Sequence, residues 1–187
     1  MSESRALSPR STGTEKPKGP MNVFWIKDKD APVESLPAQA LNEPYTELRS
    51  KALLQRQDAA PGSCPYDMVV LYQFWSHFLI RNFNTHMYDE FRQLAFEDDR
   101  DRASDHGLKN LLMFYDKTLC NDRLNIRDRV ARHYVALVKA EPTEHGRPAF
   151  KQLRAAWRNG ALNMRNRKRI TPYVDADLQA ALDAVEQ

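Results

Sequence analysis

A leucine–aromatic signature recurs three times along this chain at a spacing of about 40 residues. The copies are LYQFW from Leu71, LLMFY from Leu111 and LRAAW from Leu153, so the two intervals are 40 and 42 residues. A fixed period of this size on helical patterns is typical of a solenoid of stacked helix pairs. One large aromatic in each copy is expected to pack in the core rather than to stack on a ligand: Trp75, Tyr115 and Trp157.

The composition fits one small domain. The chain has 187 residues, 42% of them hydrophobic, and a mean hydropathy of −0.68. These values allow a core but predict no membrane span, and the first residues lack the apolar stretch of a signal peptide. Cys64 and Cys120 give no disulfide framework, which predicts a reducing, cytoplasmic environment.

The positive charge of the chain is concentrated near its C-terminus. The net charge is only +3, yet residues 145–174 hold eight Lys and Arg and no Asp or Glu. The remainder of the chain therefore has more acidic than basic residues. A basic end on an acidic body favours an anionic partner such as nucleic acid, although a merely solvated basic face would look the same.

The N-terminal residues 1–42 are predicted to be a disordered tail. Ser, Pro, Thr, Lys and Gly dominate residues 1–20, which cannot bury enough surface to fold. An apolar island at residues 22–26, NVFWI, interrupts this composition. It is either a docking motif for a partner or a strap that covers the exposed end of the first repeat, and we favour the strap.

Residues 43–187 are predicted to be an all-α domain of three helix pairs. Helical periodicity indicates a leading helix over 43–57, a first pair over 68–82 and 84–95, a second pair over 108–119 and 126–138, and a third pair that opens over 148–157. Asp67 is expected to be the N-cap of the first helix in the first pair. Gly160 is expected to end the helix over 148–157. Loops are expected at residues 97–105 and 161–171. The last helix is expected to start at Thr171-Pro172 or at Asp175. No segment shows the alternation of apolar and polar residues that is typical of a strand.

One stretch carries a specific resemblance. Residues 74–98 read FWSHFLIRNFNTHMYDEFRQLAFED. They resemble the C-terminal tandem-repeat domain of the La-related protein 1 family in the elements FWxxFL, FNxxMYxEF and LAxED. The likeness continues more weakly over about residues 45–182, through Gly107-Leu108, Phe114-Tyr115 and Leu119.

The resemblance implies a HEAT-like fold and a role in translation. In the family, this domain binds the 5′ end of messenger RNA, gripping the methylguanosine cap and the first pyrimidines, and so occludes the initiation factor that reads caps. RNA, and further proteins of translation, are therefore the implied partners of a monomeric domain without a cofactor. The family's upstream La-type module is absent from this chain, so the chain is either a fragment or a domain that occurs alone.

The resemblance also implies where the cap would lie, and three of these positions have changed chemistry. The two tyrosines that sandwich the charged purine correspond to Lys117 and Asn159, and the acidic residue that reads the guanine edge corresponds to Cys120. A lysine in the sandwich would repel the cationic base, which electron-rich rings and a carboxylate select. A two-residue slip would bring Tyr115 into the sandwich but would break the register on either side.

The other three positions belong to the phosphates and the first nucleotide. Two phosphate-gripping arginines correspond to Gln73 and Met113, and a phenylalanine near the first nucleotide corresponds to His77. Stacking is worth roughly 1–3 kcal/mol per base, so the replacements would remove most specific affinity. We therefore expect the scaffold to be kept while the family's cap recognition is lost or rebuilt.

A basic cluster near the C-terminus could still hold RNA. Arg154 and Arg158 are one helical turn apart and share a face. The remaining members follow in the next segment: Arg165, Arg167, Lys168 and Arg169. Arginine forks suit phosphates and stack on bases, although a solubilising loop or a nuclear-localisation signal has the same composition.

Other functional signals are absent from the sequence. The five histidines, at positions 77, 86, 106, 133 and 145, have no metal-ligand spacing with either cysteine, and no glycine-rich phosphate loop is present. We therefore expect a non-enzymatic RNA-binding domain. The alternatives are a protein-interaction scaffold and cap binding through substituted residues. Arginines on the concave face would favour RNA, and arginines paired with Asp175, Asp177 or loop acids would favour the scaffold.

Overall fold

The computed structural model describes residues 24–26 and 42–184, which fall into two compact units, residues 1–46 and 47–187. In the first unit, β1 (Phe24–Ile26) pairs antiparallel with β2 (Asn42–Pro44), and Trp25 lies opposite Glu43. The expectation of no strand is therefore wrong, because segments of three residues are too short to show alternation. Most of the predicted disordered tail, including Asn22 and Val23 of the predicted strap, lies outside the described residues.

The second unit is built from helices. The first of these, α1, begins at the end of the first unit and continues into the second. The elements are α1 (Tyr45–Asp58), α2 (Tyr66–Arg81), α3 (Thr85–Arg102), α4 (His106–Leu119), α5 (Asp128–Ala140), the 3₁₀ turn η1 (Thr143–His145), α6 (Pro148–Arg158), α7 (Met164–Ile170), the 3₁₀ turn η2 (Thr171–Tyr173) and α8 (Ala176–Asp183). The all-helical repeat fold predicted from the sequence is confirmed. No helix in residues 24–26 and 42–184 is long and apolar enough to cross a bilayer.

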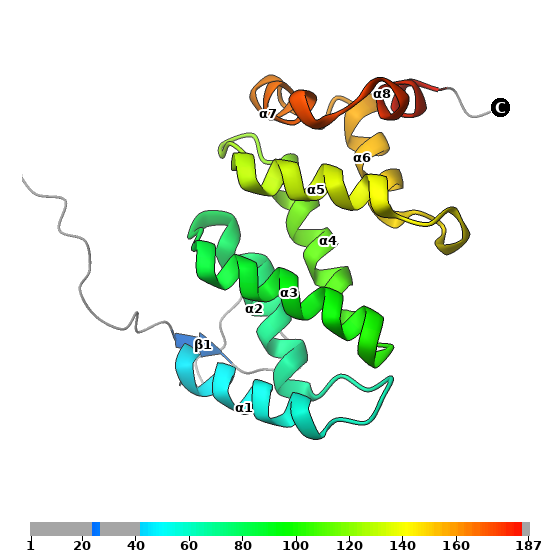
Figure 1. Ribbon diagram of the computed structural model, residues 1–187. Helices are drawn as coiled ribbons and strands as arrows, with labels where there is room; N and C mark the ends of the chain where they lie inside the picture. Colours follow the sequence, from blue (N-terminus) through cyan, green and yellow to red (C-terminus); the bar gives the residue numbers. More distant parts are fainter. Residues whose placement is uncertain (1–23, 27–41, 185–187) are drawn as a thin grey trace, which may run out of the picture. The chain divides into compact units, whose positions relative to one another are not determined.

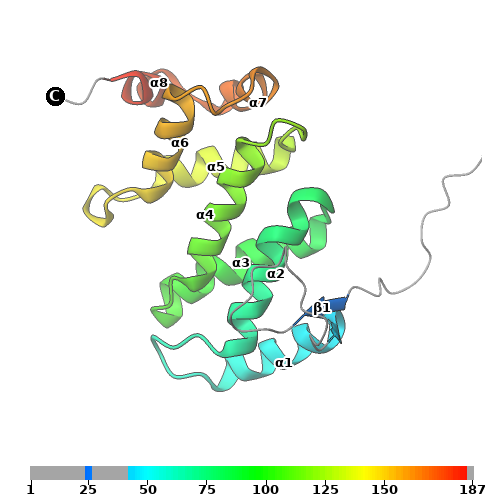
Figure 2. The ribbon, with the colours of Figure 1, turned by 180° about the vertical axis from the view of Figure 1, so that it is seen from behind.

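The helices of the second unit stack in two rows. Helices α3 and α5 lie in one row, which α7 continues, and α2, α4 and α6 lie in the other (Figure 1). Figure 2 views the unit from the side of α4 and α6, with α5 behind. From α2 to α6, each helix also packs against the next one in sequence across the two rows, as α3 does on α4 and α5 on α6. This alternation is the helix-pair stacking that the 40-residue period predicts.

The same period appears in the polar contacts between repeats. Arg129 of α5 donates to Asp89 of α3 at 2.8 Å, and these residues are 40 apart in sequence. Gln152 of α6 donates to the carbonyl of Leu112 in α4 at 2.9 Å, again 40 apart. Corresponding positions of successive repeats thus touch one another, as nearest-neighbour stacking requires.

The aromatic signature lies in the core, as predicted. Trp75 and Tyr115 are fully buried and Trp157 is 5% exposed. The rings continue from repeat to repeat: Trp75 packs on Phe91 within the first repeat with centroids 5.6 Å apart, and Phe91 packs on Phe114 of the second repeat at 6.4 Å. Large aromatics at fixed intervals therefore join the repeats into one continuous core.

The predicted end of α3 and start of α2 are wrong. Residues 97–102 continue α3 because Asp98 is buried and accepts hydrogen bonds from Tyr72 Oη at 2.5 Å and Arg56 Nε at 2.7 Å. Pro65, rather than Asp67, precedes the first turn of α2. Asp67 is buried within that turn and accepts from Gln55 Nε2 at 2.8 Å. The sequence predicts a loop position for Asp98 and a capping role for Asp67, but both carboxylates make tertiary contacts.

Predicted signals at other helix ends are confirmed. Gly160 follows the C-cap residue of α6 and has a φ of 70°, a conformation that favours glycine. Pro148 is the first residue of that helix. Asp175 caps α8 by accepting from the backbone N–H of Leu178 at 2.9 Å. The third repeat therefore begins and ends as the sequence indicates, although residues 164–170 within it form a helix in place of the predicted loop.

The backbone of α4 approaches its neighbours closely at Gly107, near the start of the helix. A Cβ atom at this position would lie 2.8 Å from the Cα of Ala95 in α3 and 2.7 Å from the Tyr72 ring in α2. Neither neighbour can move freely, because one is backbone and the other is the ring whose hydroxyl is bonded to Asp98. Glycine is thus required here for close helix packing.

Gly107→Ala should destabilise the protein by about 2–3 kcal/mol, since overpacking outweighs the gain in helix propensity. The free energy of unfolding in urea measures the effect. Ala136→Gly, at an exposed position of α5, is the matched control for propensity alone and should cost about 1 kcal/mol. A stabilised Gly107→Ala variant would contradict the close packing.

A buried polar chain crosses the middle of the stack. Tyr88 Oη lies 3.1 Å from Tyr115 Oη and 2.9 Å from Nδ1 of His133 in α5. Burial, together with the positive charges of Arg92 and Arg129, lowers the pKa of His133 to about 4. The neutral imidazole is therefore the form that the folded protein accommodates.

The free energy of unfolding should consequently fall as the pH drops from about 6.5 to about 4. In this window the unfolded chain binds a proton at His133 that the folded chain does not. Urea unfolding at a series of pH values measures the slope. His133→Gln should flatten it, whereas His106→Gln, at an exposed position of α4, should leave it unchanged. An equal slope in both variants would contradict this assignment.

Candidate functional site

Five of the six positions implied by the family pocket lie on two neighbouring helices. Gln73 and His77 are one turn apart on α2, Met113 and Lys117 are one turn apart on α4, and Cys120 is the C-cap residue of α4. The Nζ atom of Lys117 lies 3.5 Å from Nε2 of His77. The structure thus brings together two positions that are 40 residues apart in sequence.

The His77 ring is fixed by its own helix. Its Nδ1 atom lies 2.9 Å from the carbonyl oxygen of Gln73 and 3.1 Å from the hydroxyl of Ser76. A carbonyl only accepts, so Nδ1 carries the hydrogen and Nε2 accepts from the ammonium of Lys117. Where a cap-binding pocket would present aromatic rings, this chain presents an imidazole and a cation.

Cys120 cannot supply the missing carboxylate. Its thiol lies 3.7 Å from Asp116 Oδ1, and burial, together with the negative charge of Asp116, raises its pKa to about 11. The thiol therefore stays neutral. Asn159, the sixth position, is the exposed C-terminal cap of α6, and no hydrogen bond joins it to the other five positions within residues 24–26 and 42–184.

The basic cluster lies on α6 and α7, and two of its members hold the end of α8. The guanidinium groups of Arg154 and Arg158 both donate to the carbonyl oxygen of Ala184, the second at 3.0 Å. Arg167 lies over the ring of Trp157, with Cζ 4.3 Å from the centroid. These arginines therefore have structural contacts within the third repeat.

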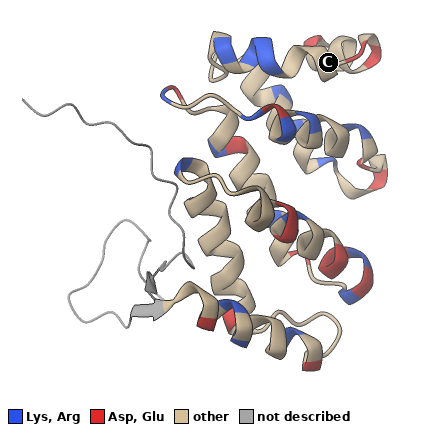
Figure 3. Ribbon diagram, turned by 60° about the vertical axis from the view of Figure 1, so that its left-hand side comes forward, with Lys and Arg blue, Asp and Glu red and all other residues tan. Residues whose placement is uncertain are grey.

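The other cluster members lie on α7 (Figure 3). Arg169 donates to the carbonyl of Ile126 at 3.1 Å. Arg165 and Lys168 are exposed and form no ion pair or hydrogen bond with the described part of the chain. Asp175 pairs instead with Lys139 at 2.6 Å. Among the described residues, no cluster arginine pairs with Asp175, a pairing that would have favoured a protein scaffold.

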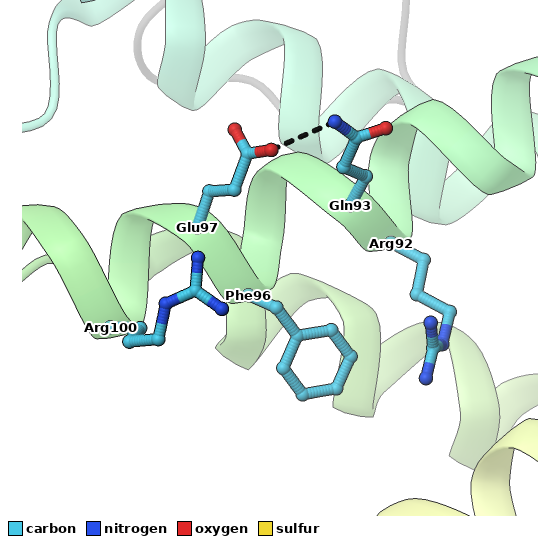
Figure 4. Close-up of a pocket in the computed structure, with 5 residues that line it drawn as sticks. All are labelled: Arg92, Gln93, Phe96, Glu97 and Arg100. Atoms are coloured by element: carbon cyan, nitrogen blue, oxygen red, sulfur yellow. Dashed lines mark hydrogen bonds between the residues drawn. The ribbon is translucent and has the colours of Figure 1, made fainter.

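A shallow depression of about 370 Å³ lies on α3 (Figure 4). Arg92, Gln93, Phe96, Glu97 and Arg100 line it, and all five come from α3. A hollow made by one helix face has no second wall to enclose a small molecule. Within the described residues, no group of three His, Cys, Asp or Glu is arranged to hold a metal ion.

Residues 37–143 match the family model of the LARP1 HEAT repeat region, which is more than half of the chain. The chain belongs to this family. The match covers the first five pocket positions, from Gln73 to Cys120, and confirms the resemblance carried by residues 74–98. It ends before α6, so Asn159 and the basic cluster lie beyond the matched residues.

Sequence reasoning missed the helix that carries most of the basic cluster. Residues 161–171 were expected to form a loop, yet residues 164–170 are helical, with Asn163 as the N-cap. The reason is Asn166, which is fully buried: its Oδ1 accepts from the backbone N–H of Ile126 at 2.8 Å, and its Nδ2 donates to the carbonyl of Leu119 at 2.8 Å. An Asn-Arg-Lys-rich segment gives no apolar periodicity from which to predict this.

Asn166→Asp should destabilise the protein by about 3 kcal/mol, because a buried carboxylate oxygen would face the carbonyl of Leu119. Asn166→Ala should cost about 2 kcal/mol by leaving the N–H of Ile126 unpaired. Thermal and urea unfolding measure both. Asn125→Ala, at an exposed position of the same connection, should change stability by less than about 0.5 kcal/mol. Equal effects at both asparagines would argue against the anchor.

Proposed function

We propose that this chain is a non-enzymatic RNA-binding domain that binds messenger RNA near its 5′ end and acts in the cytoplasm to control translation or message stability. Membership of the LARP1 HEAT repeat family supports a role of this kind. The observation that carries the proposal is the basic cluster. Arg158, Arg165, Arg167, Lys168 and Arg169 form no ion pair with a carboxylate in residues 24–26 and 42–184.

The arrangement of the cluster fits a flexible anionic chain. Arg165 and Lys168 are exposed and three residues apart, so they lie on one face of α7. Arg167 and Arg169 are held by contacts to Trp157 and the Ile126 carbonyl, which position their charge beside that face. A short row of fixed and mobile cations binds successive phosphates without reading bases.

Cap recognition of the family type is not part of the proposal. A cationic purine would need an aromatic ring at position 117 and a carboxylate at position 120. This chain has the ammonium of Lys117 and the neutral thiol of Cys120 there instead. We infer that RNA binding in this chain is phosphate-based and that the 5′ end is recognised by other chemistry.

The double variant Arg165→Ala/Lys168→Ala should weaken binding of a pyrimidine-rich RNA oligomer several-fold. It should also make the log–log salt slope shallower by about 1.4, since each phosphate contact on a single strand contributes about −0.7. Fluorescence anisotropy at a series of salt concentrations measures both quantities.

The matched control is Arg100→Ala/Lys109→Ala, which removes the same net charge. Its two cations are already paired with Asp101 and Asp105, both at 2.7 Å. Equal weakening in both double variants would show that net charge alone drives binding. A wild-type chain that binds no RNA would overturn the proposal in favour of a protein-interaction scaffold.

A further inference from the structure

In the contact between His77 and Lys117, the lysine is a cation and the imidazole is its hydrogen-bond acceptor, and no carboxylate of the described residues pairs with either side chain. Lys117 is exposed, its Nζ atom lies 3.5 Å from Nε2 of His77, and neither residue pairs with a carboxylate in the described part of the chain. An ammonium has three N–H donors, of which His77 can accept one. The other two are open to solvent and to any anion that approaches this face of α2 and α4.

The surroundings direct this ammonium outward. His77 is held by the Gln73 carbonyl and by Ser76, which is itself buried and lies 3.4 Å from Asn110 of α4. The carboxylate nearest in sequence, Asp116, is half-buried and bonded to the thiol of Cys120 rather than to Lys117. The lysine is thus positioned by an imidazole while the neighbouring negative charge is engaged elsewhere.

A second cation lies on α2, on the face that carries His77. Arg81 is one turn beyond His77, and its exposed side chain forms no ion pair or hydrogen bond within residues 24–26 and 42–184. Gln73, one turn before His77, adds an exposed amide. The face therefore offers donors at successive turns and has no aromatic ring among these positions.

We propose that Lys117, positioned by His77, binds the terminal phosphate of RNA that carries a 5′ monophosphate, with Arg81 beside the phosphates that follow. This inference rests on the proposed RNA-binding function and names the end that it selects. A phosphate monoester carries about −1.5 to −2 charges and three terminal oxygens, whereas an internal diester carries one charge. A single exposed ammonium therefore distinguishes the end of the chain from its interior by charge, and it repels the cationic base of a cap.

The test uses the whole chain and three oligomers of one pyrimidine-rich sequence, labelled at the 3′ end, that begin with a 5′ hydroxyl, a 5′ monophosphate or a methylguanosine cap. Anisotropy at low salt should show that the monophosphate binds about fivefold more tightly than the hydroxyl form, as expected of one partly exposed charge-assisted contact. The capped oligomer should bind no better than the hydroxyl form.

Variants then assign the effect to the residues. Lys117→Ala should abolish the preference for the monophosphate but leave binding of the hydroxyl form nearly unchanged, and Lys117→Arg should restore it. His77→Phe should reduce the preference although it removes no lysine, because the ammonium loses its acceptor. Lys109→Ala, an exposed lysine of the same helix that is paired with Asp105, should keep the full preference.

The outcomes separate this inference from the function on which it rests. Equal, salt-sensitive binding of all three oligomers would overturn the end selection and leave RNA binding intact. A preference for the capped oligomer would overturn it in favour of a rebuilt cap pocket. Absence of binding to every oligomer would overturn both proposals. A preference that survives Lys117→Ala would place the phosphate elsewhere and overturn the assignment.

Discussion

The stack depends on how closely α4 can approach its neighbours at Gly107. Its missing side chain lets the helix lie against the backbone of Ala95 and the ring of Tyr72 at once. In a linear array each repeat contacts only adjacent repeats, so the position of one helix sets the position of all that follow. A displacement of α4 would shift the aromatic core, in which Phe114 packs against Tyr88 and Phe91.

Buried polar side chains then fix the repeats in register. Asp98 joins α3 to Arg56 of α1 and to Tyr72 of α2, and Asn166 joins α7 to the connection between α4 and α5. Apolar packing alone is tolerant of sliding, because dispersion has little directional preference. Hydrogen bonds inside the core are directional and costly to break, so each one accepts only a single arrangement of the helices it joins.

The surface of this frame carries two separate sets of cations. The basic cluster lies on α6 and α7 and is held by contacts to Trp157 and to the backbone, whereas Lys117 lies on α4 beside His77. The first set suits a run of phosphates and the second suits one highly charged group. The chain belongs to the LARP1 HEAT repeat family, and we propose that its stacked helices support both sets.

The sequence by itself determined the fold class, the repeat period and the core aromatics, because helical hydrophobic periodicity is a local property of the chain. It also located Gly160 and Asp175 at helix ends, since caps act within one turn. Only the tertiary structure decided that Asp98 is buried, that Asn166 turns a basic segment into a helix, and that Lys117 meets His77. Each of these depends on a partner some 26 to 48 residues away in sequence. No local pattern reports such a partner, because the interaction exists only once the repeats have stacked.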